Sequence, residues 1–114
     1  MSVKLSTRQV GKVTILDLAG RITLGEGSSA LRDTLRRLIE NGQTQILVNL
    51  ADVNYIDSSG IGELVAGFTS VGSHGGQLKL LNLTKRVKDL LQITKLYTVF
   101  EVFDDEAAAI RSFS

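Results

Sequence analysis

Residues 46–62 read ILVNLADVNYIDSSGIG and join an apolar run to a helical pattern. Four of the five residues 46–50 are aliphatic, and the run is too short for a helix, which predicts a buried strand. Further on, apolar side chains recur at helical spacing, which predicts a helix with one inward face: Ile61, Leu64, Val65, Phe68 and Val71. The polar residues between them therefore lie at a strand-to-helix turn. The first N–H groups of a helix lack internal partners there, and the helix dipole favours an anion.

Helix capping is the simplest role for the polar residues of this turn. Asp57, Ser58 or Ser59 could each accept a hydrogen bond from the first helical turn. A capping box would need Glu or Gln three residues after the cap, and those places hold only Gly or Ile. Capping therefore accounts for one of the three residues and leaves the others open to a second role.

The composition restricts the classes of function. The chain has 114 residues, 13 basic and 12 acidic, so its net charge of +1 does not favour nucleic acid or an anionic membrane as a partner. It has no cysteine and one histidine, which excludes disulfides, thiolate metal sites and imidazole clusters, and we expect no metal and no cofactor. No apolar run approaches the roughly 18 residues of a membrane span, and the N-terminus has no long apolar leader. We expect a cytoplasmic protein.

The N-terminal part predicts two antiparallel strands. Val3–Val10 and Lys12–Leu18 alternate or run apolar, and Gly11 between them suits a tight hairpin. The second strand has apolar side chains on both faces, as in a strand covered from two sides. We expect Gly20 to end this strand.

Five further elements and one strand-to-helix unit complete the chain. A helix is predicted to start at Ser28 or Ser29, to bury Leu31, Leu35, Leu38 and Ile39, and to end at Asn41 and Gly42. The C-terminal part is predicted to contain a strand over Gln77–Leu83, a short helix capped by Thr84, a strand over Thr98–Phe103, and a helix that starts at Asp104 and Asp105 and runs through Phe113. This order predicts one α/β domain over residues 1–114, with a mostly parallel sheet and an N-terminal antiparallel hairpin.

Catalytic roles for the serines find little support. A serine hydrolase needs a nearby base, and His74 follows the second helix, roughly 18 to 20 Å from its start at 1.5 Å per residue. A phosphate-binding loop would need its Gly-rich motif with a lysine, which the chain lacks. The spacing of Asp52, Asp57 and Glu63 matches no metal-binding loop.

Small side chains step along one strip of the second helix. The strip consists of Ser58, Gly62, Ala66, Thr69 and Ser73. Its lack of long charged side chains would let the backbone of another protein approach, or would let another element of the same domain pack there. Gly67 lowers helix stability by about 0.5 to 1 kcal/mol relative to alanine, which a close approach of some neighbour would explain.

Residues 47–62, with Asp-Ser-Ser-Gly-Ile-Gly after the strand, resemble the signature of STAS domains, specifically of bacterial anti-sigma factor antagonists. The similarity also covers the opening hairpin, the Gly-Gly-x-Leu entry at Gly75 and the last strand and helix. The resemblance implies a regulatory protein rather than an enzyme. Such antagonists bind an anti-sigma factor that is also a serine kinase and so free a sigma factor. The kinase phosphorylates the serine that corresponds to Ser58, and a phosphatase restores binding.

The resemblance places the partner surface on the turn and the adjoining helix. The residues expected there are Asp57, Ser58, Ser59, Gly60, Ile61, Gly62, Ala66 and Thr69. One departure concerns Gly20-Arg21-Ile22-Thr23, which replaces the Gly-x-Leu-Asp common in these antagonists, so an acidic contact expected near Thr23 is missing. The alternative is a STAS scaffold or transport-complex subunit in which Ser58 is only a cap. An enzyme acting through Ser58 is a third possibility.

Overall fold

The computed structural model describes residues 3–114, so the first two residues of the predicted domain lie outside the described residues. In this part of the chain the order is β-β-α-β-α-β-α-β-α, as predicted. The elements are β1 Val3–Val10, β2 Val13–Ile22, α1 Glu26–Glu40, β3 Gln45–Ile56, α2 Ser58–Ser73, β4 Gln77–Leu81, α3 Lys85–Ile93, β5 Val102–Phe103 and α4 Glu106–Arg111.

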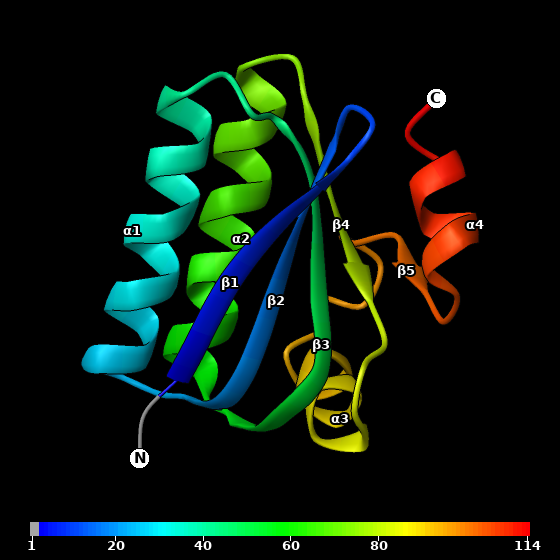
Figure 1. Cartoon of the computed structure of the whole chain (residues 1–114). Coiled ribbons are helices and arrows are strands. Elements are labelled where there is room, and N and C mark those ends of the chain that lie inside the picture. The colour runs from blue at the N-terminus through cyan, green and yellow to red at the C-terminus, as the bar shows by residue number, and fades with distance from the viewer. Residues whose placement is uncertain (1–2) are drawn as a thin grey trace.

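The five strands form one sheet in the order β1-β2-β3-β4-β5. β1 and β2 are antiparallel, and the other neighbouring pairs are parallel. Gly11, with a φ of 60°, forms the predicted hairpin turn. In Figure 1, α1 and α2 lie side by side on one face of the sheet, and α4 lies on the opposite face. The predicted α/β fold with a mixed, mostly parallel sheet is confirmed.

The sheet carries an apolar core on each face. The larger core joins β2, β3 and β4 to α1, α2 and α3, and the smaller one joins the sheet to α4 around Ala109. β2 contributes to both, because Leu16 and Leu18 belong to the larger core and Val13 and Ile15 to the smaller one. The prediction of a strand covered from two sides is therefore confirmed.

Three predicted boundaries in the first half of the chain are wrong. The central strand, predicted over residues 46–50, continues to Ile56 because its second half pairs with β2. Gly20 does not end β2: the strand continues to Ile22, with irregular register on either side of Gly20, whose φ is 93°. The extra residues of these irregularities lie in β3, and the positive φ of Gly20 lets β2 follow them without the strain a side chain would add. The first helix begins at Glu26 rather than at Ser28 or Ser29. Gly25 is its N-cap residue without a side-chain cap. Ser28 instead donates its backbone N–H to the carbonyl of Thr23.

The C-terminal half differs from the prediction at three boundaries. β4 ends at Leu81, because Asn82 takes the left-handed φ of 59°. The last strand contains two residues, Val102 and Phe103, since the preceding segment turns and buries Phe100 against Phe68, with the ring centroids 5.4 Å apart. The terminal helix begins after the cap Asp105 and ends at Arg111, before Phe113. Packing of one aromatic ring here outweighs the strand propensity of the segment.

The parallel strands β2 and β3 end at the same edge of the sheet. β2 passes there into α1, and β3 passes into α2 through Asp57 (Figure 1). No helix in the described residues is long and apolar enough to cross a membrane.

Candidate functional site

Asp57 is the N-cap residue of α2, and its carboxylate holds the whole turn. Oδ1 accepts hydrogen bonds from the backbone N–H of Ser59 at 3.0 Å, the backbone N–H of Gly60 at 3.1 Å and the hydroxyl of Ser59 at 2.6 Å. Oδ2 accepts the backbone N–H of Leu24 at 3.0 Å. One carboxylate thus satisfies two free N–H groups of the helix and connects α2 to the loop after β2.

The electrostatics of Asp57 follow from these contacts. Burial opposes ionisation of the carboxyl, but the hydrogen bonds from Ser59, Leu24 and Gly60 favour the charged form and together lower the pKa of Asp57 below its ordinary value. Asp57 is therefore a negatively charged cap at neutral pH. It is a structural residue of the turn, with both oxygens engaged.

The two serines of the turn differ in exposure and in bonding. Ser59 is half-buried, and its hydroxyl donates to Asp57. Ser58 is exposed, and no residue in the described part of the chain forms a hydrogen bond with its hydroxyl. Capping therefore occupies Asp57 and Ser59, and the Ser58 hydroxyl is left facing solvent.

Gly60 and Ile61, two residues of the predicted partner surface, are buried. Ile61 is 2% exposed and packs in the larger core. Gly60 is buried, and a Cβ there would lie 2.7 Å from Cγ1 of Ile56 and 2.8 Å from the carbonyl oxygen of Ile22. Both residues seat the first turn of α2 on the ends of β2 and β3. Neither residue is exposed at the surface.

The predicted strip of small residues lies on the surface. Ser58, Gly62, Ala66, Thr69 and Ser73 are all exposed, and the position of a Cβ on Gly62 has no atom within 4 Å. Among the described residues, no other element of the domain covers this strip. Gly67, in contrast, is buried, and its missing side chain makes room for Cδ1 of Leu35 on α1, 2.7 Å from where a Cβ would be. The close approach predicted at Gly67 is thus made within the domain.

A groove between α1 and α2 borders the strip. Its volume is about 490 Å³, and Ala66, Gly67 and Ser70 line it from α2. Arg32 of α1 crosses to Glu63 of α2 at 3.3 Å. The groove is open and is lined by side chains of both charges, so it is a surface depression beside the strip rather than a closed ligand cavity.

His74 lies at the other end of α2. It is the C-cap residue, and its Nδ1 is 2.8 Å from the carbonyl oxygen of Ser70. The helix of 16 residues spans roughly 24 Å at 1.5 Å per residue, which separates the imidazole from Ser58. The geometry of the described residues therefore provides no imidazole base for either serine.

An aromatic ring with two guanidinium groups is a feature of this edge that the sequence analysis missed. Cζ of Arg21 lies 4.5 Å, and Cζ of Arg86 4.2 Å, from the centroid of the Tyr55 ring. The three side chains come from β2, β3 and the first turn of α3. Only the parallel pairing of Arg21 with Tyr55 brings the first two together, and sequence spacing does not reveal it.

The family model of the STAS domain matches residues 4–109. The chain belongs to the STAS domain family. A relative named anti-sigma-B factor antagonist, from Bacillus subtilis strain 168, is 33% identical over 102 residues, which are 90% of this chain and 92% of the relative.

Two solved structures of other proteins share the fold. An anti-sigma factor antagonist from Mycobacterium paratuberculosis superposes with a TM-score of 0.86 at 15% identity, over 97% of this chain and 93% of that one. The Bacillus cell fate determinant SpoIIAA in its phosphorylated form gives a TM-score of 0.77 at 20% identity, over 97% and 100%. At such identities the likeness concerns the architecture.

Proposed function

We propose that this chain is a cytoplasmic anti-sigma factor antagonist: it binds a serine-kinase anti-sigma factor, which releases a sigma factor, and phosphorylation of Ser58 switches this binding off. The role of the B. subtilis relative, named an anti-sigma-B factor antagonist, supports the first part. The bonding of the turn supports the second. Ser58 has an exposed hydroxyl outside the hydrogen bonds that hold the turn, so a kinase can reach it without first breaking the cap.

The partner surface in this proposal consists of Ser58, Gly62, Ala66 and Thr69, with the half-buried Ser59 at its border. Its exposed members follow one side of α2 and present little side-chain bulk, so a partner can approach the helix backbone closely. Asp57, Gly60 and Ile61 support this surface from beneath, through the cap and the core. The chain acts by binding and is the substrate of the kinase and of a phosphatase, rather than an enzyme.

Phosphorylation would change the charge of this surface more than its shape. A phosphoserine carries about −1.5 to −2 charges. The positive end of the helix dipole attracts this charge and the ionised Asp57 repels it, and because the two effects offset each other the fold can retain the group. A partner packed over Ser58 must desolvate the phosphate. A cost of ~3 to 4 kcal/mol for this would weaken binding a few hundredfold, since each ~1.4 kcal/mol is tenfold in affinity.

The proposal is tested by comparing the two serines as bait. Wild type, Ser58→Asp, Ser58→Ala and Ser59→Ala are used to capture proteins from lysate of the source cell, and the captured fraction is incubated with labelled ATP. We expect wild type, Ser58→Ala and Ser59→Ala to capture a kinase that Ser58→Asp does not. Label should enter wild type and Ser59→Ala but not Ser58→Ala. Equal capture by all four, without label on Ser58, would favour a STAS scaffold or transport subunit instead.

A further inference from the structure

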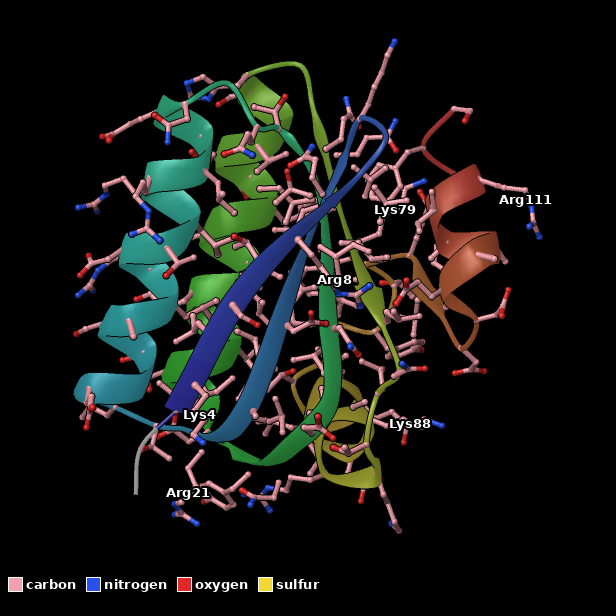
Figure 2. All side chains as sticks on the ribbon, viewed as in Figure 1. Lys4, Arg8, Arg21, Lys79, Lys88 and Arg111 are labelled. Atoms are coloured by element: carbon pink, nitrogen blue, oxygen red, sulfur yellow. The ribbon has the colours of Figure 1, made fainter. Side chains whose placement is uncertain are left out.

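The side chains of Arg21, Tyr55 and Arg86, here called the arginine platform, lie at the edge of the sheet where β2 and β3 end. Figure 2 shows Arg21 at that end of the molecule, far from Arg111. Both guanidinium groups lie within 4.5 Å of the same ring centroid, so they are within about 9 Å of each other. Stacking on the ring face fixes the position of each cation while leaving its N–H donors free to bind an anion.

No carboxylate forms an ion pair with the platform in the described part of the chain. Neither Arg21 nor Arg86 takes part in any of the ion pairs found there, whereas Arg8, Arg32 and Lys85 each do. Residues 18–25, the end of β2 and the loop toward α1, contain no Asp or Glu. Two like charges held close together without an ion-pair partner favour an anionic group from outside the domain.

The platform is continuous with the Ser58 turn. Arg21 is paired with Tyr55 in the β2–β3 register, and Ile22, the next residue, accepts the backbone N–H of Asp57 at 3.2 Å. Tyr55 precedes Ser58 by three residues, a span of at most about 10 Å of chain. A protein that covers Ser58 therefore reaches the platform with the same face.

We propose that the arginine platform docks an acidic segment of the partner that covers Ser58. Carboxylates of that segment would form forked, charge-assisted hydrogen bonds with the two guanidinium groups. This inference rests on the proposed function and adds the charge of the partner to it. It also explains the direction of the switch, because a phosphate on Ser58 would lie beside the same acidic segment and repel it.

A titration with hexaglutamate tests the platform without the partner. The unphosphorylated chain, labelled with ¹⁵N, is followed by NMR at low salt as hexaglutamate is added. We expect the largest shifts at Arg21, Tyr55 and Arg86, and their loss in the double variant Arg21→Glu/Arg86→Glu. The matched control is Lys12→Glu/Arg111→Glu, with the same change of net charge on exposed residues away from the platform. Shifts spread over all basic residues, or equal in the two double variants, overturn the proposal.

Binding to the kinase captured through Ser58 is the second measurement. At low salt, Arg21→Glu/Arg86→Glu should bind it at least about 30-fold more weakly, with a shallower salt dependence, and Lys12→Glu/Arg111→Glu should bind within about twofold of wild type. Tyr55→Leu should give an intermediate loss with an unchanged melting temperature. If Ser58→Asp loses the kinase while Arg21→Glu/Arg86→Glu keeps it, the docking inference fails and the proposed function stands. Vesicles with phosphatidylserine that bind through Arg21 and Arg86, together with unchanged kinase binding, would assign the platform to a membrane instead.

Discussion

Two strand-to-helix turns at one edge of the sheet cap the first N–H groups of their helices in different ways. Asp57 begins α2, and its carboxylate accepts four hydrogen bonds, one of them from the loop after β2. Thr84 begins α3, and its hydroxyl accepts one, from the backbone N–H of Val87 at 3.3 Å. The first turn is held by the ionised carboxylate of Asp57, and the second by a single hydrogen bond to the neutral hydroxyl of Thr84.

The two turns also differ in the charge of their surfaces, and here the turn with the charged cap has the neutral surface. The strongly bonded turn presents the small hydroxyl of Ser58, while the weakly bonded one presents the cations Lys85 and Arg86. Lys85 is paired with Asp89 at 2.8 Å, and Arg86 extends over Tyr55. The comparison shows that, within one turn, the residue that caps the helix and the residue that faces solvent can be separate. Their contributions to stability and to binding can then be altered independently.

The largest effect is expected from removal of the charged cap. Asp57→Ala leaves two N–H groups of α2 and that of Leu24 without their acceptor, and it should lower the free energy of unfolding by about 3 kcal/mol. The same truncation at Thr84 removes one neutral bond and should cost about 1 kcal/mol. Urea denaturation of both variants measures the difference. Equal losses would show that the two caps are equivalent.

Acid should remove the stability that the ionised Asp57 cap adds to the fold. The pKa of Asp57 is lower in the folded chain than its ordinary value, so the stability it adds is complete at neutral pH and is lost as the pH falls below about 4. The gap in unfolding free energy between wild type and Asp57→Asn should therefore narrow between pH 7 and pH 3. Both variants contain Asp17 and Glu106, whose pKa values the Arg8 guanidinium also lowers, so the contribution of these two groups to the pH dependence cancels in the difference. A gap that widens in acid would contradict the assignment.

The smallest effects separate the two serines. Ser59→Ala removes the 2.6 Å hydrogen bond to Asp57 and should lower the unfolding free energy by about 1 kcal/mol. Ser58→Ala removes an exposed hydroxyl and should change it by less than about 0.5 kcal/mol. Thermal and urea unfolding of the two variants in parallel give the comparison. A larger loss at Ser58 than at Ser59 would mean that Ser58 helps to hold the turn.

The sequence contains enough information for the element order and for the position of the turn, because periodicity and cap residues act locally. The helix after the serine turn, predicted from Ser59 and found from Ser58, the C-cap at Asn41 and Gly42 and the cap at Thr84 all follow from neighbouring residues. Which serine bonds to Asp57 depends on the direction of a carboxylate that the loop at Leu24 also holds. That loop is 33 residues away in the chain, so spacing alone does not reveal the choice.

Long-range packing explains the remaining differences. Gly20 reads as a strand end, but the parallel partner β3 continues beside it and keeps β2 extended to Ile22. The segment before β5 has strand-forming residues, but burial of Phe100 turns it. The Tyr55 ring meets arginines from two distant segments, and no local pattern predicts that contact.

The bond between Leu24 and Asp57 has a consequence for the kinetics of recognition. It ties the loop after β2 to the first turn of α2 and so restricts the motion of one relative to the other. An interface built on such a frame loses little conformational entropy on association, and its rate can approach that of docking two rigid bodies. The speed of a response that depends on this surface would then be set by diffusion and charge rather than by rearrangement of the chain.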